Sequence, residues 1–289
     1  MKFHSLIASY IYLFFTILSA ALTLFFIMAG SAHAQQINGA KILSGQTIEG
    51  GLIIAHTDPA NHIMLANEPV SIAENGIFVV GFHRDSDKPL ILTITTPDGQ
   101  SMNTTLVPDQ RNYKIQRIDG LKSAMVTPPK TVLARIKADG RLVKAARKIY
   151  GPLGDFWEGF DWPARGAISG VYGSQRILNG EPRQPHYGID IAGPRGTPVY
   201  APANGFITLV KDLYFSGWTI IMTHGLSVNS SFLHLDQVKV KEGMFVERGA
   251  LIGTIGATGR ATGPHLDWRI DWKGRRIDAG LLVGKMQPQ

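Results

Sequence analysis

Histidine and aspartate stand close together twice in the C-terminal half of the chain. His186 and Asp190 are four residues apart, so in a strand both side chains face one side and can reach the same cation. His265 and Asp267 are two residues apart and also share one face of a strand, with Leu266 on the opposite face. Imidazole nitrogen and carboxylate oxygen are both zinc donors, so these spacings predict a metal site.

The remaining histidines of the chain differ in their surroundings. His234 alternates with Leu233 and Leu235, as a polar residue on the exposed face of a strand would. Any single histidine also suits a structural, hydrogen-bonded role, but three of them near acids in one domain favour chemistry. Five others are assigned to surface or turn positions or to the N-terminal leader, namely His56, His62, His83, His4 and His33.

The composition excludes several classes of protein and of site. The 289-residue chain has 44% hydrophobic residues and no cysteine, which excludes a mainly disordered chain, disulfides, thiolate metal sites and cysteine nucleophiles. Any metal must therefore bind histidine, aspartate or glutamate. The 29 basic and 22 acidic residues favour anionic surfaces such as cell-wall polymer or lipid headgroups. No nucleic-acid-binding motif is visible, so we expect no nucleic-acid partner.

The first 34 residues have the layout of a signal peptide. Lys2 is their only charged residue, and an apolar run over 6–29 precedes Ser31-Ala32-His33-Ala34. We expect cleavage after Ala34 and export to the periplasm, with no lipid anchor because there is no cysteine. An uncleaved inner-membrane anchor is the alternative, since the run is long enough to span a bilayer. Membrane contact would then be confined to this segment.

Residues 35–127 are predicted to form an accessory β-domain. Short apolar runs at 50–55, 76–82 and 90–95 are separated by turn residues, and Pro97-Asp98-Gly99 follows the last run. This spacing predicts a sandwich-like domain of about six to eight strands. Nothing in it indicates catalysis.

Residues 128–150 are predicted to be a basic, partly helical linker. Pro128-Pro129 interrupts the strand pattern, and the apolar spacing that follows predicts a helix broken at Gly140. Asp139 is the only acid among seven basic residues, Lys130, Arg135, Lys137, Arg141, Lys144, Arg147 and Lys148. A solvated helix face is the favoured explanation, and contact with an acidic partner is the alternative.

Residues 151–289 carry dense glycine between short β-branched runs, which predicts an antiparallel all-β domain with many tight turns. Gly188, between the first histidine and aspartate pair, would let another backbone approach closely. The expected strands are 197–200, 206–210, 218–222, 237–240 and 251–255.

Several motifs follow one another in about 115 residues from Gly166 to Leu282: His186-x-Gly-x-Asp190, Gly196-Thr-Pro-Val-Tyr-Ala-x-x-x-Gly205, His224-Gly, Phe-Leu-His234-Leu and Thr258-Gly-Arg-x-Thr-Gly-Pro-His265-Leu-x-Trp268. This stretch resembles the bacterial zinc metallopeptidases of the lysostaphin and LytM type, peptidase family M23. The resemblance implies a C-terminal antiparallel β-sheet groove domain of the LytM type. The fold class is then all-β, with the N-terminal sandwich-like domain and the basic linker before it.

The resemblance also implies roles by position. His186 and Asp190 match two zinc ligands of the family. His234 and His265 match the pair that handles the attacking water and the tetrahedral intermediate. The family pattern ends in His-x-His, whereas this chain has Asp267 at the place of the second histidine. Aspartate also binds zinc, so one zinc per chain with Asp267 as third ligand is expected. A second carboxylate moves the preference towards harder divalent ions such as manganese.

The function implied by the resemblance is that of an exported, metal-dependent endopeptidase acting on peptidoglycan cross-links or stem peptides in cell-wall remodelling. The alternative is an inactive domain of this type that binds and activates a cell-wall amidase, because Asp267 departs from the pattern. Peptidoglycan is the expected partner, with an envelope protein as a second one. His224 matches a position that the family uses structurally, and Trp268 and Trp272 are expected in the core.

Overall fold

The computed structural model describes residues 36–121, 123–151 and 154–286. The predicted signal segment, 1–34, lies outside the described residues. Within the described part of the chain, no helix combines the length and the apolar character that crossing a bilayer requires.

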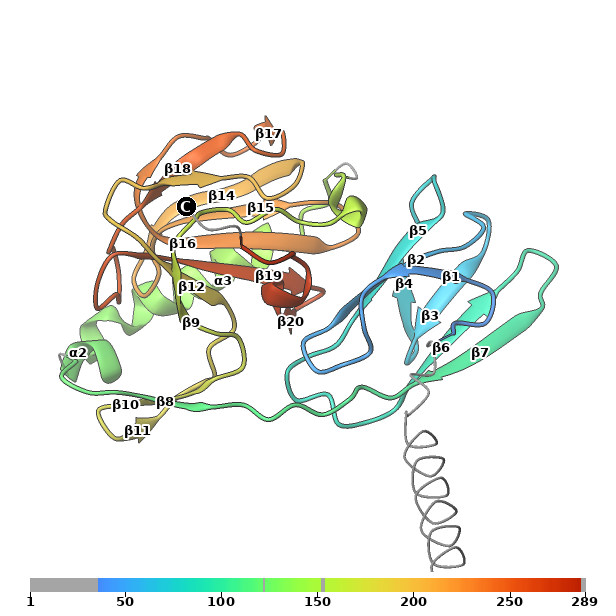
Figure 1. Ribbon diagram of the computed structural model, residues 1–289, viewed down its shortest axis with the longest axis horizontal. Coiled ribbons are helices and arrows are strands. Elements are labelled where there is room, and N and C mark those ends of the chain that lie inside the picture. The colour runs from blue at the N-terminus through green and yellow to red at the C-terminus, as the bar shows by residue number, and fades with distance from the viewer. Residues whose placement is uncertain (1–35, 122, 152–153, 287–289) are drawn as a thin grey trace, which may run out of the picture. The chain divides into compact units, whose positions relative to one another are not determined.

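Seven N-terminal strands form two antiparallel sheets, coloured blue to green in Figure 1. The strands are β1 (Lys41–Ser44), β2 (Leu52–His56), β3 (His62–Leu65), β4 (Glu68–Val70), β5 (Ile77–Gly81), β6 (Leu90–Thr95) and β7 (Ser101–Leu106). They pair in the orders β1-β2-β5 and β4-β3-β6-β7. Apolar side chains of both sheets belong to one hydrophobic core. The seven strands agree with the six to eight expected from the sequence.

The predicted turn Pro97-Asp98-Gly99 joins β6 to β7. Gly99 has a φ of 87°, a left-handed conformation that glycine adopts without steric cost. The turn is closed by the N–H of Thr96, which donates to the carbonyl of Gln100 at 2.9 Å. The turn residues therefore fix the register of this hairpin.

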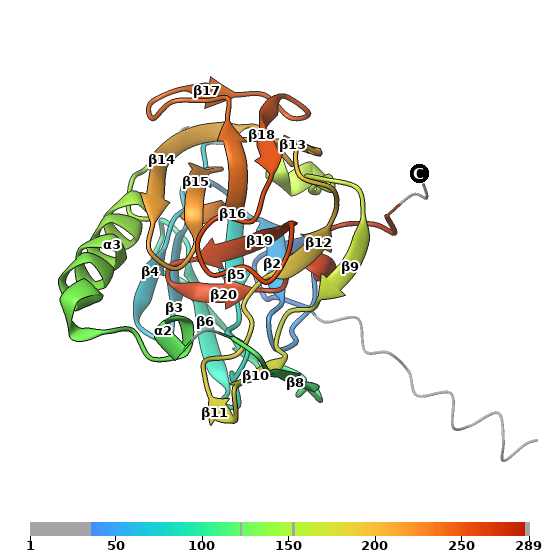
Figure 2. The ribbon, with the colours of Figure 1, turned by 90° about the vertical axis from the view of Figure 1, so that its left-hand side faces the viewer.

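Ten strands of the C-terminal half form one sheet with antiparallel pairing throughout. They are β9 (Ala167–Gly170), β12 (Ile189–Ala192), β13 (Pro198–Tyr200), β14 (Gly205–Leu213), β15 (Gly217–Thr223), β16 (Val228–Val238), β17 (Phe245–Val246), β18 (Leu251–Ile255), β19 (His265–Trp272) and β20 (Arg275–Ile277). Its main path runs β17-β14-β15-β16-β19-β12-β9, as Figure 2 shows for the central strands. Of the run expected at 237–240, Gln237 and Val238 are the last two residues of β16, and Lys239 and Val240 lie outside any strand.

Strand β19 divides its side chains between two environments. Its apolar residues lie in the core, Trp268 and Trp272 at no more than 1% exposure, as predicted. The alternate residues Asp267, Arg269 and Asp271 must face the other side of the sheet. Asp267 and Asp271 are nevertheless buried, so their carboxylates require partners on that side.

The basic linker contains an unbroken helix, so the predicted break at Gly140 is wrong. Helix α3 (Leu133–Ala146) follows the short α2 (Ser123–Val126) and the 3-10 turn η1 (Lys130–Val132). One interior glycine costs a helix only about 1 kcal/mol, which tertiary packing offsets. This packing joins Val143 and Ala146 to Leu209, Leu213 and Ile221, so that α3 lies beside β14 (Figure 2).

Replacing Gly140 by alanine should stabilise the protein by about 0.5–1 kcal/mol, because alanine loses less backbone entropy in a helix. A Cβ at this position meets no atom within 4 Å. The midpoint of urea denaturation measures the change. Gly154→Ala is the contrasting variant and should destabilise, since its Cβ would stand 2.3 Å from the carbonyl oxygen of Asn204. An unchanged midpoint for Gly140→Ala would argue against a continuous α3.

One strand from the predicted accessory range joins the C-terminal half. Strand β8 (Ile115–Ile118) pairs in parallel with β10 (Gln175–Leu178), which also pairs with β11 (Glu181–Pro182). Two ion pairs also join the N-terminal part of the chain to the C-terminal half. Arg111 pairs with Asp278 at 2.9 Å, and Glu68 of β4 pairs with Arg275 of β20 at 3.1 Å. The 3-10 turns η2 (Phe156–Glu158) and η3 (Ala279–Leu281) complete the elements. The segment that holds β8 thus comes to lie beside the predicted site.

Candidate metal centre

Two neighbouring strands bring the three predicted metal ligands together. Asp190 of β12 lies opposite Asp267 of β19 in the antiparallel pair. His186 comes just before β12, where its backbone N–H donates to the carbonyl of Ser174 at 2.8 Å. One donor atom from each of the three residues lies within 4.8 Å of the other two, and all three residues are buried.

Several polar atoms of this cluster have no hydrogen-bond partner among the described residues. They are Nδ1 and Nε2 of His186 and Oδ1 of Asp190. His186 Nε2 lies 3.0 Å from Asp190 Oδ1. Buried nitrogen and oxygen atoms are costly when unpaired, and a shared cation would satisfy them. The donor set therefore suits a metal ion held by His186, Asp190 and Asp267.

Two glycines make room for the carboxylates. A Cβ on Gly188 would stand 2.2 Å from Asp267 Oδ1, and a Cβ on Gly170 would stand 2.2 Å from Asp190 Oδ2. Neither distance is compatible with a side chain. Gly188 thus permits the close approach that its position in the sequence suggests, and the neighbour it admits is the third candidate ligand.

Arg269 holds Asp267 in place. Its Nε donates to Asp267 Oδ1 at 2.9 Å and its Nη2 donates to Oδ2 at 2.5 Å. Burial alone would raise the pKa of Asp267, but the facing Arg269 guanidinium keeps that pKa well below its usual range. Sequence reasoning missed this pair, although residues two apart in a strand share a face.

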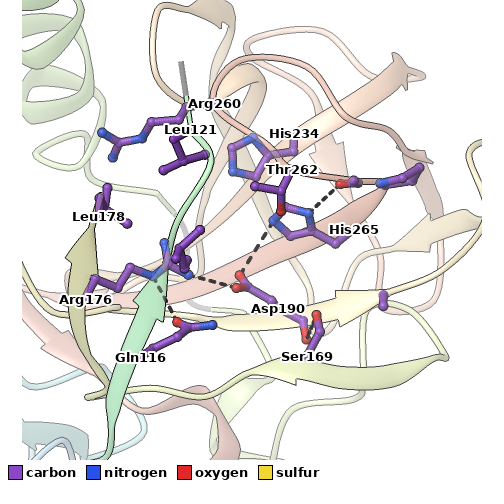
Figure 3. Close-up of a pocket in the computed structure, with 14 residues that line it drawn as sticks. Gln116, Leu121, Ser169, Arg176, Leu178, Asp190, His234, Arg260, Thr262 and His265 are labelled. Atoms are coloured by element: carbon purple, nitrogen blue, oxygen red, sulfur yellow. Dashed lines mark hydrogen bonds and ion pairs between the residues drawn. The ribbon is translucent and has the colours of Figure 1, made fainter. Parts of the chain in front are cut away.

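Asp190 is oriented by a chain of side chains that reaches β8. Its Oδ2 accepts a hydrogen bond from Arg176 Nη2 at 2.9 Å, and Arg176 Nε donates to Gln116 Oε1 at 3.3 Å. Figure 3 shows Asp190 between Arg176 and His265. Arg176 therefore contacts a candidate ligand. Arg183 instead donates to Thr127 Oγ1 at 3.3 Å.

The two predicted catalytic histidines lie side by side, with ring centroids 4.8 Å apart (Figure 3). His234 Nδ1 bonds to the carbonyl of Thr258 and His265 Nδ1 to that of Gly263, both at 2.8 Å. A carbonyl only accepts, so each Nδ1 carries a hydrogen, and Nε2 has a lone pair whenever the ring is neutral. Burial lowers the pKa of His234 to about 4, so this ring is neutral near pH 7.

The backbone of β16 turns His234 into the site in a way that the alternation pattern does not predict. His234 has a φ of 65°, an uncommon conformation for a residue with a side chain. As a result, Leu233 and His234 line the same cavity, although consecutive residues of a regular strand face opposite sides. His234 is only 6% exposed, so the predicted exposed position is wrong.

The other histidines of the described residues lie elsewhere. His224 is fully buried, with Nδ1 2.8 Å from the carbonyl oxygen of Asn204 and Nε2 2.7 Å from Ser230 Oγ. It makes no contact with the metal cluster and has the features of a structural residue. His56, His62 and His83 belong to the N-terminal half and are not among the residues that line the cavity at the cluster.

We expect His224 to make stability depend on pH. Burial lowers its pKa in the folded protein to about 4, against about 6.5 in the unfolded chain. Between these values only the unfolded chain binds the proton, so the free energy of unfolding falls as the pH drops. At pH 5 the loss is about 2 kcal/mol relative to pH 7. Urea denaturation in the presence of a chelator, compared between the parent and His224→Gln, measures it; equal slopes would contradict the assignment.

A cavity of about 280 Å³, the metal pocket, opens at this cluster. Asp190, His234 and His265 lie on its walls. Gln116, Ile118 and Leu121, from the segment around β8, line it as well. A candidate metal site with two imidazole Nε2 atoms beside it is suited to hydrolysis of a bond presented in this cavity.

The comparisons with known proteins agree with this geometry. Residues 184–279 match the model of peptidase family M23. The peptidoglycan DD-endopeptidase ShyA of Vibrio cholerae is 40% identical over 95 residues, which are 33% of this chain and 22% of that protein. The DD-carboxypeptidase/endopeptidase Mpg of Neisseria meningitidis is 39% identical over 93 residues, or 32% of this chain and 21% of that protein. The chain thus spans about a fifth of the length of these curated relatives.

The likeness to one solved structure extends beyond the matched residues. A crystal structure of a candidate peptidase M23 from Pseudomonas aeruginosa aligns with a TM-score of 0.66 and 28% identity. The alignment covers 84% of this chain and 97% of that one. The candidate ligand cluster and the two histidines also lie within the matched range, on or next to strands of the antiparallel sheet. Residues 184–279 of this chain therefore form a domain that matches peptidase family M23.

Proposed function

We propose that this protein is an exported metalloendopeptidase that hydrolyses peptide bonds of peptidoglycan. The observation that carries the proposal is the buried His186, Asp190 and Asp267 cluster, with the imidazoles of His234 and His265 beside it. The relatives named peptidoglycan DD-endopeptidase and DD-carboxypeptidase/endopeptidase support the substrate class. The signal-like segment supports a periplasmic location.

Zinc is the metal that we propose for the three ligands, and when bound it supplies a Lewis acid that activates water and polarises a peptide carbonyl. The side chains of this chain then supply the proton transfers. Nε2 of His234 and Nε2 of His265 can each accept a proton or, once protonated, donate one to the departing amine. Thr258 and Gly263 hold both rings through Nδ1, so that Nε2 stays available.

We further propose that Asp267 and Arg269 together replace the second histidine of the family pattern. An aspartate adds a negative charge that would weaken the metal as a Lewis acid, whereas a histidine adds none. The two hydrogen bonds from Arg269 return one positive charge to the same position. The pair is therefore neutral overall, as a histidine would be, and the metal keeps its charge.

Substituting Asp267 and Arg269 singly and together should show that their charges compensate each other. We expect Asp267→His alone and Arg269→Gln alone each to weaken zinc binding about 10–100-fold, because each leaves one charge unbalanced. The double variant should bind zinc within about tenfold of the parent. Titration with a competing chelator measures all four affinities. Additive losses in the double variant would show that Arg269 does not act through Asp267.

The function is tested on the chain from Gln35, purified without chelators. Elemental analysis gives the metal content, and release of peptides from purified peptidoglycan gives the activity. About one zinc per chain, with hydrolysis that a chelator stops and added zinc restores, is the expected result. A metal-free chain that digests nothing, even with zinc supplied, would contradict the proposal. Stimulation of a cell-wall amidase by such a chain would favour the activator alternative.

A further inference from the structure

A second cavity of about 270 Å³ adjoins the metal pocket, and five arginines line it. We name it the arginine pocket. Arg176, His234 and Arg260 line both cavities, and Asp267 also lines the second one. Its arginines are Arg147, Arg176, Arg260, Arg269 and Arg276. Any group bound there lies next to the candidate catalytic residues.

The carboxylates around the arginine pocket balance only some of its positive charge. Arg176 pairs with Asp190 at 2.9 Å and Arg269 with Asp267 at 2.5 Å. Arg276 Nη1 stands 3.5 Å from Asp271 Oδ2 and, like that oxygen, has no hydrogen-bond partner among the described residues.

Arg147 is the least compensated arginine of the pocket. Its Nη2 donates to Ser231 Oγ at 3.3 Å, but its Nε is buried without a hydrogen-bond partner among the described residues. No carboxylate of the described part of the chain forms an ion pair with Arg147. Burial, and then the nearby Arg276, lower the pKa of Arg147 to about 9, although Asp271 acts in the opposite direction. An anion beside the unpaired Nε would stabilise the charged guanidinium.

The origin of Arg147 is also informative. It is the residue at the C-terminal end of α3, outside residues 184–279 that match the family model. Helix α3 packs against β14, and the guanidinium of Arg147 reaches Ser231 of the central strand β16. Arg147, which follows the last residue of the linker helix, thus contributes its side chain to the arginine pocket.

The remaining wall of the arginine pocket combines the hydroxyl groups of Ser216, Thr219 and Ser231 with an apolar part, formed by Val143, Leu213, Phe215, Ile221 and Leu233. An inorganic anion would leave this apolar part unused, whereas a peptide with a carboxylate and a small aliphatic side chain would contact both walls. Arginine forks bind carboxylates through paired N–H groups, which gives geometric selectivity as well as attraction.

We propose that the arginine pocket is a substrate subsite in which Arg147 and Arg276 bind a carboxylate of the peptide being cleaved. This inference rests on the proposed function and specifies its substrate as a peptide with a free carboxylate close to the scissile bond. The carboxylate can be the C-terminal one or that of an acidic side chain, and both present the same chemistry to the two guanidinium groups.

Direct binding tests the subsite without requiring hydrolysis. The probes are stem peptides in three forms: unmodified, amidated at the C-terminus, and amidated at the side-chain carboxylate. They are titrated calorimetrically into the His265→Gln protein, which should bind them without turnover. We expect one of the two amidations to weaken binding about 10–100-fold. The carboxylate that this amidation blocks is the one that the pocket binds. Equal affinity for all three peptides would overturn the proposal, whether or not the parent protein digests peptidoglycan.

Substitution of Arg147 assigns the effect to the pocket. Arg147→Gln should raise KM for the unmodified peptide about 10–100-fold with little change in kcat, and should leave the sensitive amidated peptide unaffected. Arg147→Lys keeps the charge and should recover part of the loss. Lys144→Gln removes an exposed cation from the same helix and should change neither constant. An equal KM increase for unmodified and amidated peptides would show a general disturbance instead.

Discussion

Replacing His186 by alanine should abolish stoichiometric metal binding, with a loss of zinc affinity of at least about 100-fold. Removing a partner that merely orients a ligand already costs about 10–100-fold, and His186 supplies a donor atom itself. Both of its ring nitrogens lack a hydrogen-bond partner among the described residues. Competition with a chromophoric chelator measures the affinity.

The matched control for His186 is His62→Ala, which removes an exposed histidine of β3 and should leave zinc binding unchanged. Peptidoglycan hydrolysis by His186→Ala should disappear together with the metal. The fold should survive, since neither ring nitrogen of His186 has a hydrogen-bond partner among the described residues that the alanine would leave unpaired. Retention of about one zinc per chain in His186→Ala would contradict the ligand assignment.

Removing either imidazole that faces the metal pocket should lower kcat about 100- to 10,000-fold while zinc stays bound, which is the range for loss of a general acid or base. His265→Gln serves for one residue. For the other, His234→Asn is preferable to alanine, because asparagine tolerates the φ of 65° at this position. Steady-state cleavage of a cross-linked peptide, with metal content measured on the same samples, tests both variants.

The combination of kinetics and metal content separates the two possible roles of these histidines. Loss of zinc from His234→Asn or His265→Gln would show that ligands and catalytic groups have been exchanged in the assignment. His224→Gln provides the contrast, because His224 bonds to Asn204 and Ser230 away from the cavity. It should reduce stability and leave kcat of the folded fraction unchanged.

Local patterns in the sequence are sufficient for much of the site. The two-residue spacing of His265 and Asp267 carries over directly, because side chains alternate with a period of two along β19. His186 and Asp190 also lie close together, although His186 stands just before β12 rather than in it. The close approach permitted by Gly188 follows from the absence of a Cβ, and the structure places Asp267 Oδ1 against it. The strand-rich character of both halves follows from the same alternation and from the turn residues.

Other features depend on contacts between distant residues or on departures from regular geometry. The positive φ of His234 breaks the alternation of β16, so the pattern that suggested an exposed residue was misleading. Helix α3 continues through Gly140 because Val143 and Ala146 pack against β14 and β15, which propensity alone does not reveal. Tertiary structure also pairs β8 with β10, far along the chain, and so brings Gln116 to Arg176.

The sequence by itself determined the fold class and indicated the candidate metal donors and the two candidate catalytic histidines, because these depend on residue type and short spacing. Only the tertiary structure decided which charges meet. Arg269 neutralises Asp267 across one strand face, while Arg147 approaches Arg276 from a helix more than a hundred residues earlier in the chain. Electrostatic balance depends on distances in space and on burial, and neither is written in the order of the residues.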